Sequence, residues 1–141
     1  MIELIEAESK VAAQIGIPGD PKVFTLSEAQ ALLPLVRGIT ETAYQSLALV
    51  SAQLDEMLVC DPRRGELSRK YETLVRRWIA KMERLGLTSS GLWRIDFDTG
   101  EGYLSWRFPE LRIAYFRDYQ GDFSRRQPLA EVIEQTAPDW A

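Results

Sequence analysis

Two long stretches of apolar residues at helical spacing constrain the fold of this chain more than any other feature. Between residues 36 and 57, and again between residues 67 and 85, large apolar side chains recur at steps of three and four. These steps keep the side chains on one narrow stripe of an α-helix, as in two helices that share a seam. The stripes are Val36, Ile39, Ala43, Leu47, Val50, Leu54 and Met57, and then Leu67, Tyr71, Leu74, Trp78, Met82 and Leu85.

A turn-forming segment separates the two stripes and predicts an antiparallel helical hairpin. Segment 61–65 reads Asp-Pro-Arg-Arg-Gly, and aspartate, proline and glycine each favour turns. We expect the first helix to end near Leu58 and the second to run from Glu66 to Leu85. Gly86 then follows as the C′ residue, a position whose left-handed conformation suits glycine.

The sequence before the hairpin predicts a helix start and a break. Thr25 and Glu28 have capping-box spacing, in which each side chain binds the backbone amide of the other residue. Pro34 lacks an amide donor and its ring crowds the preceding turn, so we expect a kink or break near Leu33 and Pro34. Residues 1–22 are predicted to form an N-terminal arm that ends in a glycine- and proline-containing turn.

After residue 92 the apolar pattern changes from helical period to alternation, which is typical of antiparallel strands. Segments 92–97 and 103–108 flank the turn-forming segment 98–102 and predict a β-hairpin, and segment 111–118 predicts a third strand. Pro128 suits the first position of a last short helix that ends near Gln135. The predicted fold class is therefore α+β: a long antiparallel helical hairpin packed on a three-stranded antiparallel β-meander, with a short C-terminal helix. Residues 23–141 are expected to form this single domain.

Alternation assigns the predicted strands two faces. The face expected to pack on the helices carries Trp93, Ile95, Phe97, Leu104, Trp106, Phe108, Leu111, Ile113 and Tyr115. The opposite face carries Arg94, Asp96, Tyr103, Ser105, Arg107, Arg112, Phe116 and Asp118.

The composition excludes several classes of function. The 141 residues contain no histidine and one cysteine, Cys60. Catalytic mechanisms that use Ser–His–Asp or Cys–His are therefore excluded, and a zinc site of the usual kind is not expected. We expect no metal and no cofactor. The acidic N-terminus does not resemble a signal peptide, and no membrane-spanning apolar stretch is present, so we expect a cytoplasmic protein without membrane association.

The predicted second helix is basic although the whole chain carries a net charge of −4. Residues 63–84 hold eight basic and three acidic residues, and Lys70, Arg77, Lys81 and Arg84 share one stripe. Nucleic-acid binders are usually basic overall, so we do not expect a nucleic-acid partner. We interpret the stripe as a solvated surface that lies beside acids of the neighbouring helix, such as Glu41, Asp55 and Glu56.

The charged face of the predicted sheet is the candidate ligand site. Guanidinium groups match carboxylate and phosphate oxygens, so arginines that converge there could hold an anion. The candidate residues are Arg107, Arg112, Asp118, Arg125 and Arg126. The alternative is that Arg94, Asp96, Arg107, Arg112 and Asp118 pair with one another as ordinary cross-strand ion pairs.

Large apolar residues outside the seam of the first long helix predict self-association. Leu35, Tyr44, Leu49 and Leu58 lie outside the narrow stripe that one partner helix would cover. A three-stranded sheet is short beside a helix of about 24 residues, roughly 36 Å long, so we expect part of this surface to be covered by a second copy. Closed two-fold dimers are the commonest oligomers, so a homodimer is the expected state.

Three ordered motifs within residues 24–129 resemble a known bacterial family. They are Phe-Thr-Leu-Ser-Glu-Ala-Gln from Phe24, Ile-Asp-Phe-Asp-Thr-Gly-Glu-Gly-Tyr-Leu-Ser-Trp-Arg from Ile95, and Pro-Glu-Leu-Arg-Ile-Ala-Tyr-Phe-Arg-Asp from Pro109. The chain is similar to the proteins catalogued as domain of unknown function 2203, a resemblance that implies no activity. Family members often carry Cys at the position of Ser105 and Trp-His-Glu at positions 116–118. Any thiol or metal chemistry of such members is not expected in this chain.

The sequence favours a non-enzymatic function. We expect a small interaction or regulatory module that binds itself and a protein partner. The alternative is a small-molecule or anion-binding domain, or an enzyme, that uses arginines and carboxylates of the sheet and the C-terminal loop.

Overall fold

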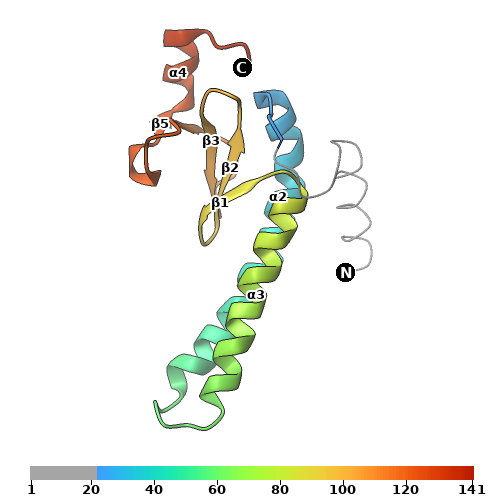
Figure 1. Ribbon diagram of the computed structural model, residues 1–141, viewed down its shortest axis with the longest axis vertical. Coiled ribbons are helices and arrows are strands. Elements are labelled where there is room, and N and C mark those ends of the chain that lie inside the picture. The colour runs from blue at the N-terminus through green and yellow to red at the C-terminus, as the bar shows by residue number, and fades with distance from the viewer. Residues whose placement is uncertain (1–21) are drawn as a thin grey trace.

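The computed structural model describes residues 22–141 as two long helices, a sheet and a short last helix (Figure 1). The predicted N-terminal arm, residues 1–22, lies outside the described residues except for Lys22. The helices are α2 (Leu26–Glu56), α3 (Arg64–Arg84) and α4 (Leu129–Thr136), with a short 3-10 helix η1 (Phe123–Arg125). The strands are β1 (Thr88–Gly91), β2 (Arg94–Asp98), β3 (Tyr103–Arg107), β4 (Tyr115–Arg117) and β5 (Gln127–Pro128).

Helix α2 begins with the predicted capping box but does not break at the proline. The Thr25 hydroxyl accepts a hydrogen bond from the Glu28 amide at 3.2 Å, and the Glu28 carboxylate accepts one from the Thr25 amide at 3.0 Å. The predicted break at Pro34 is wrong, because one helix runs through it. Pro34 itself is exposed, whereas Leu33 and Val36 on either side of it are buried. Their burial offsets the lost amide hydrogen bond.

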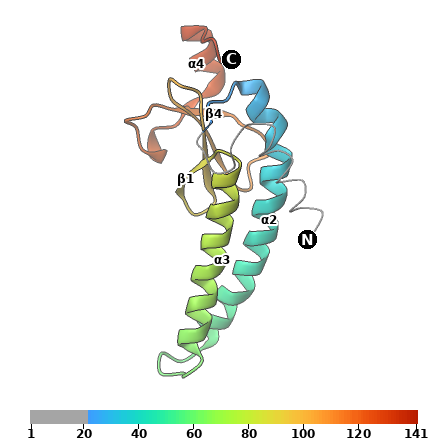
Figure 2. The ribbon, with the colours of Figure 1, turned by 45° about the vertical axis from the view of Figure 1, so that its right-hand side comes forward.

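Helices α2 and α3 form the predicted antiparallel hairpin. Near the sheet the Trp78 indole N–H donates to the Thr40 hydroxyl at 3.0 Å, so the one polar contact buried between the two helices there is satisfied. Helix α3 ends as predicted, with Gly86 at φ 82°, the left-handed conformation that glycine adopts without strain. The hairpin extends well beyond the sheet, so its distal half stands alone as a two-helix stalk (Figures 1 and 2).

Three of the four residues of the basic stripe form no ion pair with the described acids of α2. No ion pair within residues 22–141 joins Lys70, Arg77 or Lys81 to an acid of α2. Arg76 of α3 instead pairs locally with Glu72, at 3.9 Å. Such exposed pairs contribute little stability in water, so nothing forces the long basic side chains toward the neighbouring helix.

The sheet has five antiparallel strands in the order β1-β2-β3-β4-β5, which corrects the predicted three. The hairpin of β2 and β3 around residues 98–102 is confirmed. Strand β1 reads Thr-Ser-Ser-Gly and β5 has two residues, so neither carries the apolar alternation by which strands are recognised in a sequence. Trp93, predicted at the start of a strand, instead lies in the turn between β1 and β2 with φ 65°.

The last predicted strand, 111–118, is reduced to β4 and its faces are reversed. Phe116 lies opposite Leu104 and belongs to the core face, whereas Tyr115 lies opposite Ser105 on the other face. Leu111, predicted to pack on the helices, is 78% exposed. Residues 108–114 form an irregular connection, so alternation counted through them is out of phase, and a slip of one residue exchanges the two faces of a strand.

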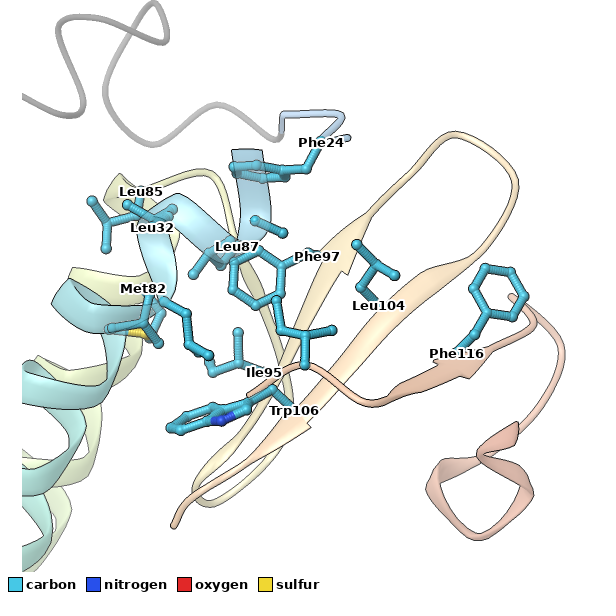
Figure 3. Packing of buried hydrophobic residues seen from close by; sticks show 14 of the residues in the cluster. Phe24, Leu32, Met82, Leu85, Leu87, Ile95, Phe97, Leu104, Trp106 and Phe116 are labelled. Atoms are coloured by element: carbon cyan, nitrogen blue, oxygen red, sulfur yellow. The ribbon is translucent and has the colours of Figure 1, made fainter. Parts of the chain in front are cut away.

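The core lies between the sheet and the sheet-proximal half of the hairpin (Figure 3). Trp106, Ile95 and Phe97 from the sheet meet Met82 and Leu85 near the end of α3, and all are buried. Phe116 lies farther from the helices, where its ring stacks on Trp140 at a centroid distance of 5.3 Å. Within the described residues, no helix is both long and apolar enough to cross a membrane.

Candidate functional site

The sheet face turned away from the core holds a buried ionic layer. Asp96, Ser105 and Tyr115 form a row across β2, β3 and β4. Arg117 donates from Nη2 to the Asp96 carboxylate at 2.6 Å and from Nη1 to the Gly121 carbonyl at 2.6 Å. Asp96 and Arg117 are both buried, so this ion pair is shielded from water.

Burial raises the pKa of the Asp96 carboxyl above its ordinary value, and the Arg117 guanidinium opposes that rise. Four buried polar atoms of this layer have no protein partner: Asp96 Oδ1, Ser105 Oγ, Arg117 Nε and Arg126 Nε. Buried polar groups are normally hydrogen-bonded, so these atoms distinguish the layer from the apolar core on the other face of the sheet.

Arg126 connects this layer to the loop that crosses it. Its guanidinium binds both carboxylate oxygens of Glu110, at 2.7 and 3.0 Å, and donates to the Ser105 carbonyl at 3.1 Å. The same group lies over the ring of Tyr115, 4.1 Å from its centroid. Arg126 is therefore held in place by a two-pronged ion pair and a stacking contact.

Above the ionic layer, the ring of Phe123 from η1 gathers three guanidinium groups. Their central carbons lie 4.2 Å (Arg94), 4.4 Å (Arg126) and 5.7 Å (Arg107) from the ring centroid. Arg94 and Arg107 are direct cross-strand partners on β2 and β3. Arg126 is neutralised by Glu110, but no described carboxylate forms an ion pair with Arg94 or Arg107. We call Arg94, Arg107 and Phe123 the arginine cluster.

The structure brings two of the five predicted ligand residues to this place. Arg107 and Arg126 contact Phe123 as described. Arg112 lies elsewhere, on the irregular connection, where it lines a cavity of about 260 Å³ with residues of α2. Asp118 and Arg125 are exposed on the loop after β4 and in η1.

The sequence reasoning missed Arg117 and Phe123 as site residues, and it named Arg94 only as a charged-face residue. The sequence pattern assigned Tyr115 to the wrong face of β4. Arg117 lies two residues later on the same face as Tyr115, so it was assigned to the wrong face as well. Phe123 stands alone in a polar loop, and the available signal was its position shortly before Arg125 and Arg126.

The four predicted interface residues do not form one patch. Leu35 is half-buried and packs against the core, and Tyr44 contacts the rings of Trp93 and Phe108 at centroid distances of 5.6 and 5.1 Å. Leu49 and Leu58 are 70% and 73% exposed, on the stalk and in the loop at its tip. Leu49 follows Tyr44 by five positions, which places the two side chains about 140° apart around α2. Within residues 22–141, no cluster of acids and cysteine that could hold a metal ion is present.

Comparison with known proteins gives one match. A family model described as an uncharacterized conserved protein (DUF2203) matches residues 22–129, which include both helices of the hairpin and the whole arginine cluster. No curated protein and no solved structure matches the chain.

Proposed function

The chain belongs to the DUF2203 family, and we propose that it is a cytoplasmic, non-enzymatic interaction module whose arginine cluster binds an acidic group of a protein partner. The observation that carries this proposal is the direct pairing of Arg94 with Arg107 across two strands without a carboxylate between them. Like charges directly opposite on neighbouring strands destabilise a sheet. A bound carboxylate or phosphate would remove that repulsion.

The chemistry of the cluster favours an oxyanion. Two guanidinium groups present planar sets of N–H donors, which match the geometry of carboxylate and phosphate oxygens. The Phe123 ring and the backbone of Gly91 restrict the position of the Arg94 side chain. Arg94 lies so close to Gly91 that a Cβ atom at residue 91 would be 3.2 Å from Arg94 Cδ. Preorganised donors lose less entropy on binding than free side chains do.

The neighbouring acids support a binding role rather than catalysis. Two carboxylates near the strands of the cluster, Asp96 and Glu110, are each engaged by an arginine, Arg117 or Arg126. A general base must be free to accept a proton from a bound substrate. Neither carboxylate is free in this way.

The exposure of the cluster favours a partner's surface over an enclosed metabolite. Arg107 is exposed, and Arg94 and Phe123 are half-buried. A ligand on these groups keeps one side in water, whereas small-molecule sites bury most of their ligand. An aspartate, glutamate or phosphorylated side chain presented by a protein fits such an open site.

A hexaglutamate peptide is the probe that tests this proposal. We expect it to shift the Nε–Hε signals of Arg94 and Arg107 in ¹⁵N NMR spectra, with an affinity that falls as salt is raised. A hexaglutamine peptide of the same length should leave these signals unchanged. Arg94→Gln and Arg107→Gln should each weaken hexaglutamate binding about tenfold, since a hydrogen bond to a charged group contributes about 1.5–3 kcal/mol.

Arg112→Gln is the matched control, because Arg112 is also exposed but lies away from the cluster. Arg107→Gln should leave thermal stability unchanged or raise it, because it removes the repulsion from Arg94. Loss of binding together with loss of stability would point to a structural role and contradict the proposal. Inorganic phosphate that binds as tightly as the peptide would instead favour a small-anion ligand.

A further inference from the structure

A hollow between α2 and the irregular connection after β3 combines unpaired arginines with apolar walls. Arg37 and Arg112 line this cavity of about 260 Å³, and its apolar walls are Leu33, Pro34, Leu111 and Ile113. From this arrangement we propose that the cavity is a second ligand site, which takes the carboxylate of a small molecule with an elongated apolar body. The site shares no residue with the arginine cluster.

Both arginines of the cavity are available to an anion. Neither Arg37 nor Arg112 forms an ion pair with an acid of residues 22–141. The Nε atom of Arg37 is buried and has no hydrogen-bond partner among the described residues. A guanidinium group stays protonated and only donates, so the partner that Arg37 lacks is an acceptor. The two coplanar oxygens of a carboxylate match the planar guanidinium fork, which makes a carboxylate the fitting anion.

The walls of the cavity require an apolar group beside that carboxylate. Leu33 and Ile113 are buried and belong to the core, so they form a fixed apolar surface. Leu111 is mostly exposed although its side chain is large and apolar. A hydrocarbon group bound against these residues is removed from water together with part of the Leu111 side chain, which favours binding. A bare inorganic anion gains nothing from such walls.

A neighbouring cavity of about 490 Å³ gives the apolar body its length. The two cavities adjoin, because both are lined by Gln30, Arg112 and Ile113. The second one extends to the start of α4, and its other lining residues, all apolar or aromatic, are Ala114, Tyr115, Pro128, Leu129, Ala130 and Ile133. No acidic residue of the described part of the chain lines either cavity. A carboxylate held by Arg37 and Arg112 therefore has room to extend an aliphatic chain past Ile113 toward α4.

Octanoate is the probe that tests this site in the full chain. Isothermal titration calorimetry should show one octanoate bound per chain. The ligand should also shift the Nε–Hε signal of Arg37 and the methyl signals of Ile113 and Leu129 in NMR spectra. Octanol lacks the negative charge and acetate lacks the apolar body, so each should bind at least about tenfold more weakly than octanoate.

Substitutions at the two ends of the hollow test the orientation of the ligand. Arg37→Gln and Arg112→Gln should each weaken octanoate binding about tenfold, because each removes a hydrogen bond to a charged group. Ala130→Trp places a large side chain beside the second cavity and should also lower the affinity for octanoate. Ala130 is exposed, so this substitution leaves the core intact. Arg94→Gln is the matched control, because Arg94 belongs to the arginine cluster and should not affect octanoate binding.

The outcome for this site is independent of the outcome for the arginine cluster. Octanoate that does not bind, or that binds no more tightly than octanol, would overturn the proposal whether or not hexaglutamate binds. Unchanged octanoate affinity in both Arg37→Gln and Arg112→Gln would do the same. Octyl phosphate that binds more tightly than octanoate would overturn the assignment to a carboxylate. Thermal unfolding of each variant separates lost binding from lost folding, and Arg112→Gln, at an exposed residue, should unfold at the wild-type temperature.

Discussion

Trp106→Ala is expected to lower the free energy of unfolding by about 3–5 kcal/mol. Trp106 is fully buried near the end of β3, on the face that meets the helices. Its indole N–H donates to the Glu110 carbonyl at 2.9 Å, so the side chain also anchors the irregular connection after β3. The substitution leaves a large cavity and an unsatisfied carbonyl.

Chemical denaturation of the Trp106→Ala protein measures this loss. Domains of this size have only about 5–15 kcal/mol of stability, so the expected loss removes a large share of it. Trp106→Phe keeps most of the volume and removes the hydrogen bond, and it should lose less stability than the alanine variant. An alanine or phenylalanine variant as stable as the wild type would show that Trp106 does not fill the core.

Arg117→Met is expected to cost about 3–5 kcal/mol at neutral pH. The substitution leaves the Asp96 carboxylate buried without its positive partner, and an uncompensated buried charge is strongly destabilising. The double variant Asp96→Leu/Arg117→Met removes both charges and should recover most of the stability. Arg76→Met is the control, because its ion pair with Glu72 is exposed and long, at 3.9 Å.

The pH dependence of this loss has a definite sign. In the folded protein the pKa of Asp96 is already raised above its ordinary value of 3.8, so the folded state holds the proton more tightly than the unfolded state. The corresponding stabilisation is present below pH 3.8 and is lost as the pH rises through the raised pKa. Loss of Arg117 raises that pKa further, so the cost of Arg117→Met should shrink as the pH falls. Urea denaturation of the wild type and of Arg117→Met at pH 7 and pH 4.5 measures the cost of the substitution at each pH. An equal cost at the two pH values would show that a charged Asp96 is not its cause.

The sequence was sufficient to predict the features that depend on neighbouring residues. The seam spacing predicted the helical hairpin, Thr25 and Glu28 predicted the start of α2, and Gly86 marked the end of α3. The turn at residues 98–102 predicted the hairpin of β2 and β3. In each case the deciding interaction lies within about one helical turn or across one tight turn, so the local pattern carries it.

Tertiary structure alone decided the features that depend on distant contacts. Pro34 stays inside α2 because its buried neighbours Leu33 and Val36 are packed by the rest of the domain. Pairing with β3 decides which face of the sheet Tyr115 and Arg117 occupy. The sequence pattern could not predict this face, because an irregular segment precedes β4 and interrupts the alternation. The arginine cluster joins residues from β2, β3 and η1, which are far apart in the chain. Sequence spacing fixes which residues share a helix face or a strand face, but only the folded chain brings separate elements together, because long-range packing has no local signal.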